Sequence, residues 1–151
     1  MLIHESGIIV ESIPIVYANY RDANNKNINI ISKTAFMTSL LNFAETFLEP
    51  VEYFEGSKYN IVFKHDKIEN NKKNQTNVYV YVILDKESEF NKHLKKKIMP
   101  LLAKILKQFK QKYHGMEFAD VSKFSEFKDN IDKVLVESSK TLDDKVSSLF
   151  S

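Results

Sequence analysis

The chain has 151 residues, of which 43% are hydrophobic and 28% charged; this is typical of one globular domain and excludes a wholly disordered chain. It contains no cysteine, which excludes disulfides and thiolate chemistry, and its net charge of +2 is too small to indicate a nucleic-acid partner. The N-terminus lacks the basic start of a signal peptide, and no run reaches the roughly 18 apolar residues of a membrane span, so we expect a cytoplasmic protein.

Two strand-like segments open the chain. Residues 2–5 predict a short strand that ends at a Ser6-Gly7 turn, and residues 8–20 predict a second strand because they are rich in β-branched and aromatic side chains. Pro14 has no N–H for a ladder, so the second strand must be broken, bulged or at a sheet edge there.

An amphipathic helix is predicted over residues 33–48. Ser32 or Thr34 can cap its first turn, and Pro50 ends it because proline disfavours helical geometry at the preceding residue. Its expected inner stripe recurs at helical spacing and consists of Phe36, Leu40, Phe43, Ala44 and Phe47.

Three further strands are expected between residues 51 and 85. Residues 51–54 predict a short strand that turns at Glu55-Gly56-Ser57 into a hairpin strand over residues 59–65. Residues 66–75 are polar and asparagine-rich, which predicts a mobile loop. The continuous apolar run at residues 78–84 is typical of a central strand that is covered on both faces.

The C-terminal half predicts two helices. The first covers residues 88–113, where Pro100 predicts a kink or break near Met99, and Gly115 is a candidate C-cap. Its expected inner stripe is Phe90, Leu94, Ile98, Leu101, Ile105 and Phe109. The second is expected over residues 125–136, with Phe127, Ile131, Val134 and Leu135 facing inward. Beyond it, four apolar residues are also helically spaced: Leu142, Val146, Leu149 and Phe150.

This β-β-α-β-β-β-α-α order resembles the longin domain, and most closely the short longin-like proteins of archaea, including the Asgard lineages. The segments that carry the resemblance are HESGIIVES, ISKTAFMTSLLNFAETFLE, YNIVFKHD, VYVYVILDK and DVSKFSEFKDNIDKVL. The resemblance implies an α/β, profilin-like fold: a five-stranded antiparallel sheet with one helix on one face and two on the other. It covers residues 1–137 and leaves residues 138–151 as a C-terminal extension.

The resemblance also implies a non-catalytic scaffold that docks a small GTPase or another longin or roadblock chain in membrane traffic, as a homo- or heterodimer. The first helix carries more apolar residues than one sheet face needs, since Met37, Leu41 and Leu48 project to one side of its stripe. In the longin family this helix and the following edge strand are a recurrent dimer surface. The partner-binding residues expected here are Thr34, Met37, Thr38, Leu41, Glu45, Tyr53 and Phe54.

The sequence leaves two alternative functions open. Residues 86–113 carry nine lysines against two glutamates, a net charge of +7, which favours either a solvated helix face or a peripheral adaptor on an acidic membrane. A small enzyme is the weakest alternative, because no nucleophile–base pair is apparent and we expect no cofactor, metal or catalytic residue. The histidines are expected to be surface residues: His4, His65, His93 and His114.

Overall fold

The computed structural model describes residues 3–11, 13–20, 37–39, 42, 53–55, 59–85 and 91–135. Five strands cover Ile3–Val10 (β1), Ile13–Asn19 (β2), Tyr53–Glu55 (β3), Tyr59–Glu69 (β4) and Gln75–Asp85 (β5). The helices are Asn91–Tyr113 (α2) and the 3-10 helix Val121–Phe127 (η1), which continues as α-helix over residues 128–135. Residues 37–39 and 42 are also helical.

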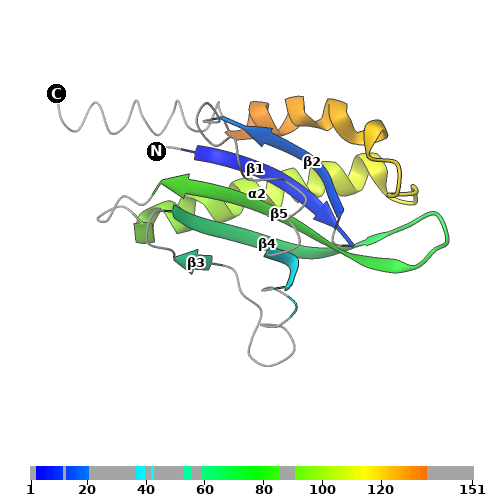
Figure 1. Ribbon diagram of the computed structural model, residues 1–151, viewed down its shortest axis with the longest axis horizontal. Helices are drawn as coiled ribbons and strands as arrows, with labels where there is room; N and C mark the ends of the chain where they lie inside the picture. Colours follow the sequence, from blue (N-terminus) through cyan, green and yellow to red (C-terminus); the bar gives the residue numbers. More distant parts are fainter. Residues whose placement is uncertain are drawn as a thin grey trace.

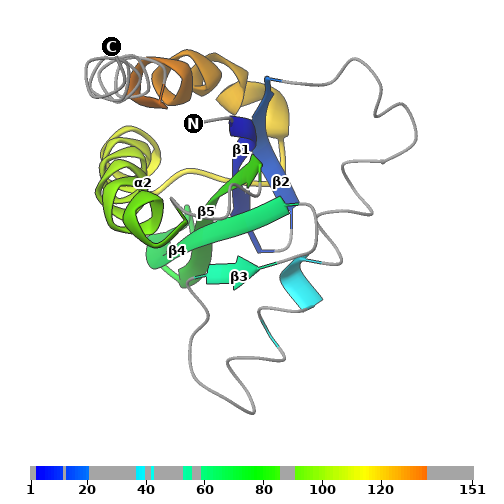
Figure 2. The same cartoon turned by 90° about the vertical axis from the view of Figure 1, so that its left-hand side faces the viewer.

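The strands form one antiparallel sheet in the order β2-β1-β5-β4-β3, which confirms the five-stranded antiparallel sheet with residues 78–84 at its centre (Figure 1). α2 and η1 cover one face of this sheet, and the helical turn at residues 37–39 lies on the opposite side (Figure 2). The α/β layering therefore agrees with the expected arrangement, although most of the predicted helix at residues 33–48 lies outside the described residues.

The central strand β5 is buried on both faces. Val80 and Val82 belong to the larger core beneath α2 and η1, whereas Tyr79 and Tyr81 belong to a smaller core on the opposite face. All four side chains are at most 4% exposed. Successive residues of a strand point to opposite faces, so a continuous apolar run at the centre of a sheet supplies both cores at once.

The helix α2 closes the larger core with a stripe at helical spacing. Its fully buried residues are Ile98, Leu102, Ile105 and Phe109. The predicted stripe contained Leu101 instead of Leu102, and Leu101 is only partly buried at the margin of this core. The Phe109 ring lies within 4.9–6.3 Å of the rings of Tyr113, Phe118, Phe124 and Phe127, so aromatic contacts join α2 to η1.

Pro100 does not interrupt α2, so a break near Met99 is wrong. Pro100 is exposed, and water can satisfy the carbonyl that its missing N–H leaves unpaired. Gly115 ends the helical segment with a positive φ of 79°, which confirms its C-cap role. Its N–H donates to the carbonyl oxygen of Glu69 at 2.7 Å and ties the end of α2 to β4.

The predicted turn at Ser6-Gly7 is wrong, because β1 runs without interruption from Ile3 to Val10. The Ser6 hydroxyl donates to the carbonyl oxygen of Tyr81 at 2.8 Å inside the sheet. Gly7 is needed for close packing: a Cβ there would lie 2.8 Å from the hydroxyl oxygen of Tyr81 and 2.9 Å from the carbonyl oxygen of Val16. Ser and Gly in this strand therefore reflect tertiary contacts and not a turn.

The second predicted strand is divided in two. Val10 pairs with Ile13, and Glu11 between them takes a positive φ of 51°, so β1 and β2 form a hairpin. The expectation for Pro14 is confirmed, since β2 is an edge strand and its register with β1 shifts opposite Ile8 and Ile9, which is a bulge.

The predicted mobile loop at residues 66–75 is wrong over most of its length. β4 continues to Glu69, β5 begins at Gln75, and only a short turn joins them. The side-chain oxygen of Asn70 accepts hydrogen bonds from the N–H groups of Lys72 and Asn74 at 2.9 and 3.0 Å. The side chain of Asn70 thus orders the tip of the hairpin. The polar composition of this segment does not reveal these local hydrogen bonds, so it was misleading as a sign of a mobile loop.

The last helix begins earlier than residue 125. Asp120 caps η1 by accepting a hydrogen bond from the N–H of Ser122. The inward residues are confirmed, because Phe127, Ile131 and Leu135 are fully buried and Val134 is 5% exposed. The extension at residues 138–151 lies outside the described residues.

We expect Gly7→Ala to lower the free energy of unfolding by about 1–3 kcal/mol, because the added methyl group overlaps the Tyr81 ring and the Val16 carbonyl. Urea unfolding followed by circular dichroism measures this cost. In a Tyr81→Leu background the cost should shrink, because the ring has gone. An equal cost in both backgrounds would contradict the close packing of Gly7 on Tyr81.

Candidate functional site

An apolar row crosses three strands at the β3 edge of the sheet. Phe54 on β3 pairs with Ile61 on β4, and Ile61 pairs with Ile83 on β5. Phe54 is 39% exposed, and the two isoleucines are only partly buried where they border the smaller core. These three residues are named the edge patch.

The strand beneath the edge patch agrees with the expectation of a short edge strand. β3 covers Tyr53–Glu55 and is the outermost strand of the sheet. Residues 51 and 52 of the predicted strand lie outside the described residues. Tyr53 is partly buried against the larger core, on the face opposite Phe54. Burial and the nearby carboxylate of Glu55 raise the pKa of the Tyr53 phenol, so it stays neutral at physiological pH.

Met37 is a correction to the expected partner surface. Its side chain is 2% exposed and packs in the smaller core with Ile9, Phe63, Tyr79 and Tyr81. It is therefore a core residue of this chain and not a surplus apolar side chain.

Thr38, beside Met37 in the sequence, is also buried, and its hydroxyl has no hydrogen-bond partner. The structure brings neither residue together with Phe54 in one exposed surface. The other expected partner residues, Thr34, Leu41 and Glu45, lie outside the described residues.

A buried polar pair lies next to the edge patch. Glu5, the partner of Ile83 in the sheet, is 3% exposed and accepts a hydrogen bond from the Tyr81 hydroxyl at 2.6 Å. Burial and the charge of Glu5 raise the pKa of Tyr81 well above its usual value, so the phenol remains a donor. Sequence analysis missed this pair; the signal was Gly7, whose lack of a side chain leaves room for the ring.

A groove separates β4 from α2 on the opposite face of the sheet. Its volume is about 290 Å³, and it is lined on the strand side by Lys64 and Asp66 and on the helix side mainly by Ala103, Leu106, Lys107 and Lys110. It is named the lysine groove. Alternate residues of a strand share a face, which places Lys64 and Asp66 together above the helix.

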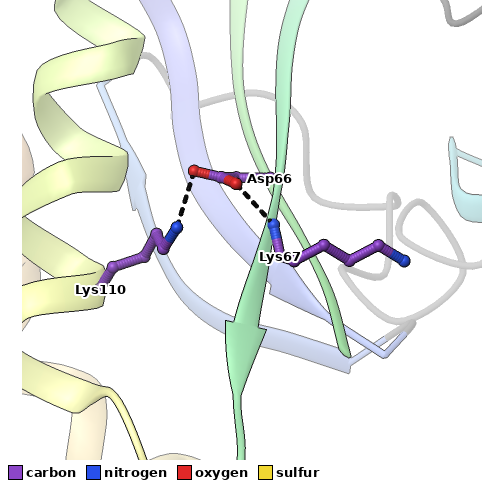
Figure 3. Close-up of polar contacts among 3 residues, drawn as sticks. All are labelled: Asp66, Lys67 and Lys110. Atoms are coloured by element: carbon purple, nitrogen blue, oxygen red, sulfur yellow. Dashed lines mark hydrogen bonds and ion pairs between the residues drawn. The ribbon is translucent and has the colours of Figure 1, made fainter. Parts of the chain in front are cut away.

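Asp66 is held in place by two donors (Figure 3). The ammonium group of Lys110 lies 3.0 Å from one carboxylate oxygen, and the backbone N–H of Lys67 donates to the other at 2.8 Å. Partial burial acts to raise the pKa of Asp66, but these two hydrogen bonds, together with the electrostatic attraction of Lys110 and His65, outweigh it and lower the pKa. Asp66 and Lys110 therefore neutralise each other within the groove.

The positive charge of α2 is only partly compensated. Lys110 pairs with Asp66, and Lys112 pairs with Glu126 at 3.4 Å. Within the described part of the chain, four exposed lysines of the same helix have no carboxylate partner: Lys96, Lys97, Lys104 and Lys107.

The described histidines lie apart and have structural contacts. The His4 ring contacts Tyr59 edge-on, the His65 ring stacks on Tyr79, and His114 lies 3.3 Å from a carboxylate oxygen of Glu69. Across the ranges that the structure describes, no group of three or more His, Cys, Asp or Glu residues could hold a metal ion. None of the described helices is long and apolar enough to cross a membrane.

Comparison of the chain with protein-family models, with curated proteins and with solved structures finds no match.

Replacing Lys110 with methionine should lower the free energy of unfolding by less than about 1 kcal/mol at pH 7, because the ion pair with Asp66 is half-exposed. The pKa of Asp66 is depressed, so its contribution is present above the ordinary value of 3.8 and is lost as the pH falls below that value. The difference between the parent chain and Lys110→Met should therefore shrink in acid, measured by urea unfolding across pH.

Lys107→Met is the matched control, since it removes a neighbouring lysine that has no ion pair among the described residues. Its effect on stability should not change over the same pH range. A Lys110→Met effect that is equally constant would show that the ion pair does not stabilise the fold.

Proposed function

We propose that this protein is a non-catalytic interaction module of longin type, which docks another protein through the edge patch. Its partner is a small GTPase or a second longin or roadblock chain, including a second copy of itself. The observation that carries this proposal is the exposure of Phe54 at the outermost strand of the sheet, in line with two partly buried isoleucines.

The physical basis is the combination of an edge strand with an apolar row. A strand at the edge of a sheet can be extended by a strand of another chain, and side chains beside it then provide specificity. Burying a phenylalanine side chain completely contributes on the order of 1.5–3 kcal/mol, and Phe54, which is 39% exposed, has a part of this still to gain. Aromatic residues are also enriched among the residues that dominate interface energies. Within the edge patch, Phe54 is the exposed side chain, whereas Ile61 and Ile83 are already partly buried, so docking would bury Phe54 most.

The partner class rests on the resemblance of the chain to longin domains, supported by the order of the sheet and by two helices on one face. The expected partner surface does not include Met37, because this residue is buried in the smaller core and stabilises the monomer. Thr34, Leu41 and Glu45 stay predicted partner residues, and the edge patch supplies the part of the surface that can be tested directly.

Phe54→Glu should weaken self-association or partner binding by about tenfold or more, because a charge at a desolvated interface centre is costly and the apolar contact is lost. The matched control is Tyr17→Glu, which changes an aromatic residue of similar exposure at the opposite edge of the sheet. Sedimentation velocity of the full chain measures self-association, and co-purification from native lysate measures partner capture.

Both variants should retain the circular dichroism spectrum of the parent, since both side chains are exposed. If Phe54→Glu and Tyr17→Glu leave association and capture equally unchanged, the edge patch is not a docking surface.

A second candidate function is peripheral attachment to an acidic membrane, favoured by the four exposed lysines of α2 that have no carboxylate partner among the described residues. A basic residue near an anionic bilayer contributes about 1 kcal/mol, and salt screens this attraction. If the protein acts in this way, it should co-sediment with phosphatidylserine vesicles at low salt and be released as salt increases.

The double variant Lys97→Glu/Lys104→Glu should then lose vesicle binding even at low salt, whereas Lys72→Glu at the β4–β5 turn should retain it. Absence of co-sedimentation of the parent chain at every salt concentration would exclude attachment to an acidic membrane.

A further inference from the structure

The lysine groove has an uncompensated positive charge on each of its two walls. Lys64 projects from β4 and Lys107 from α2, and neither has an ion pair among the described residues. The single carboxylate that lines the groove, Asp66, is neutralised by Lys110 at 3.0 Å. An anionic group in the groove would therefore lie between two lysines that have no ion pair in the described part of the chain.

Besides these charged side chains, the groove is lined by Gln111 and by two apolar residues of α2, Ala103 and Leu106. Ala103 is exposed and has the smallest side chain on the helix wall, and Leu106 beside it is almost fully buried. Because the side chain of Ala103 is small, it leaves space in the groove for a side chain of a ligand. The combination of an apolar floor with a lysine on each wall suits a ligand that carries both carboxylates and an apolar side chain.

We propose that the lysine groove binds an extended acidic peptide of a partner protein, with carboxylates between Lys64 and Lys107 and an apolar side chain against Ala103. A groove encloses an extended peptide on two sides and can offer it both apolar contacts and charged side chains. Charge complementarity selects glutamate- and aspartate-rich segments over basic ones.

The same features disfavour other polyanions. A bilayer surface is flat, so it does not require a groove and would also contact exposed lysines that do not line it, such as Lys97 and Lys104. Sequence-tolerant binding of single-stranded nucleic acid relies on aromatic stacking and on arginine, and the residues that line the groove include neither.

The lysine groove is separate from the edge patch. Ile61 and Lys64 lie on the same strand but are three positions apart, and successive residues of a strand alternate between faces, so they lie on opposite sides of the sheet. The acidic-peptide site therefore does not depend on the protein docking proposed for Phe54, and Phe54→Glu should leave peptide binding unchanged.

The test uses fluorescence anisotropy of the full chain with a fluorescein-labelled decapeptide of glutamates with one central leucine, at physiological salt. The control peptide has glutamine in place of every glutamate. Lys64→Glu and Lys107→Glu should each weaken binding by about tenfold or more, because each reverses a charge next to the ligand. Lys104→Glu is an identical charge change on the same helix, at a residue that does not line the groove, so it should weaken binding less than about threefold.

Ala103→Leu separates the groove from a general positive surface. It keeps the net charge and favours the helix, but it fills the space beside Leu106, so it should also weaken peptide binding by about tenfold or more. Circular dichroism should show that all four variants are folded.

Three outcomes would overturn the proposal. The first is equal binding of the glutamine peptide. The second is an equal loss for Lys104→Glu and Lys107→Glu with no effect of Ala103→Leu, which would show a diffuse positive surface. The third is preferential binding of phosphatidylserine vesicles that Ala103→Leu reduces, which would assign the groove to a lipid headgroup.

Discussion

The fold depends on one constraint, which is that the central strand β5 must be covered on both faces. Val80 and Val82 face α2, and Tyr79 and Tyr81 face the other side, where Met37 packs. Removing each of these side chains from water contributes on the order of 1.5–3 kcal/mol, so neither face can be left to solvent. The helices of the C-terminal half cover one face of β5, and the helical turn that contains Met37 packs against the other face.

The polar end of Tyr81 explains why a glutamate and a glycine occur in the neighbouring strand β1. A buried phenol needs a hydrogen-bond partner, and Glu5 supplies a carboxylate at 2.6 Å inside the sheet. The ring reaches that carboxylate by passing over Gly7, where any side chain would collide with it. β1 must therefore run straight through Ser6 and Gly7, and the Glu5–Tyr81 pair lies directly beside Ile83 of the edge patch.

Long periodic segments were predictable from the sequence, and positions governed by tertiary contacts were not. Strand β5 and helix α2 each repeat their pattern often enough to identify the element and most of its inward residues. Gly7 is misleading because a Ser-Gly pair is typical of a turn. Here the glycine is required because it leaves room for Tyr81, which is 74 residues away in the sequence. Met37 misleads because a helix with apolar residues around much of its circumference does not define which of them faces the sheet. The lysine groove joins Asp66 to Lys110, 44 residues apart, so no local spacing could indicate it.

Strand β4 supplies side chains to both proposed surfaces. It presents Ile61 to the edge patch and Lys64 to the lysine groove, because successive residues alternate between faces. Two ligands can therefore contact this strand at once without competing for a side chain. Coupling between them would require an element with two alternative arrangements. β4 is paired with β5 through eleven residue pairs and is joined to the end of α2 at Glu69, so it offers no such alternative. The two surfaces should bind independently, which suits a module that brings two proteins together.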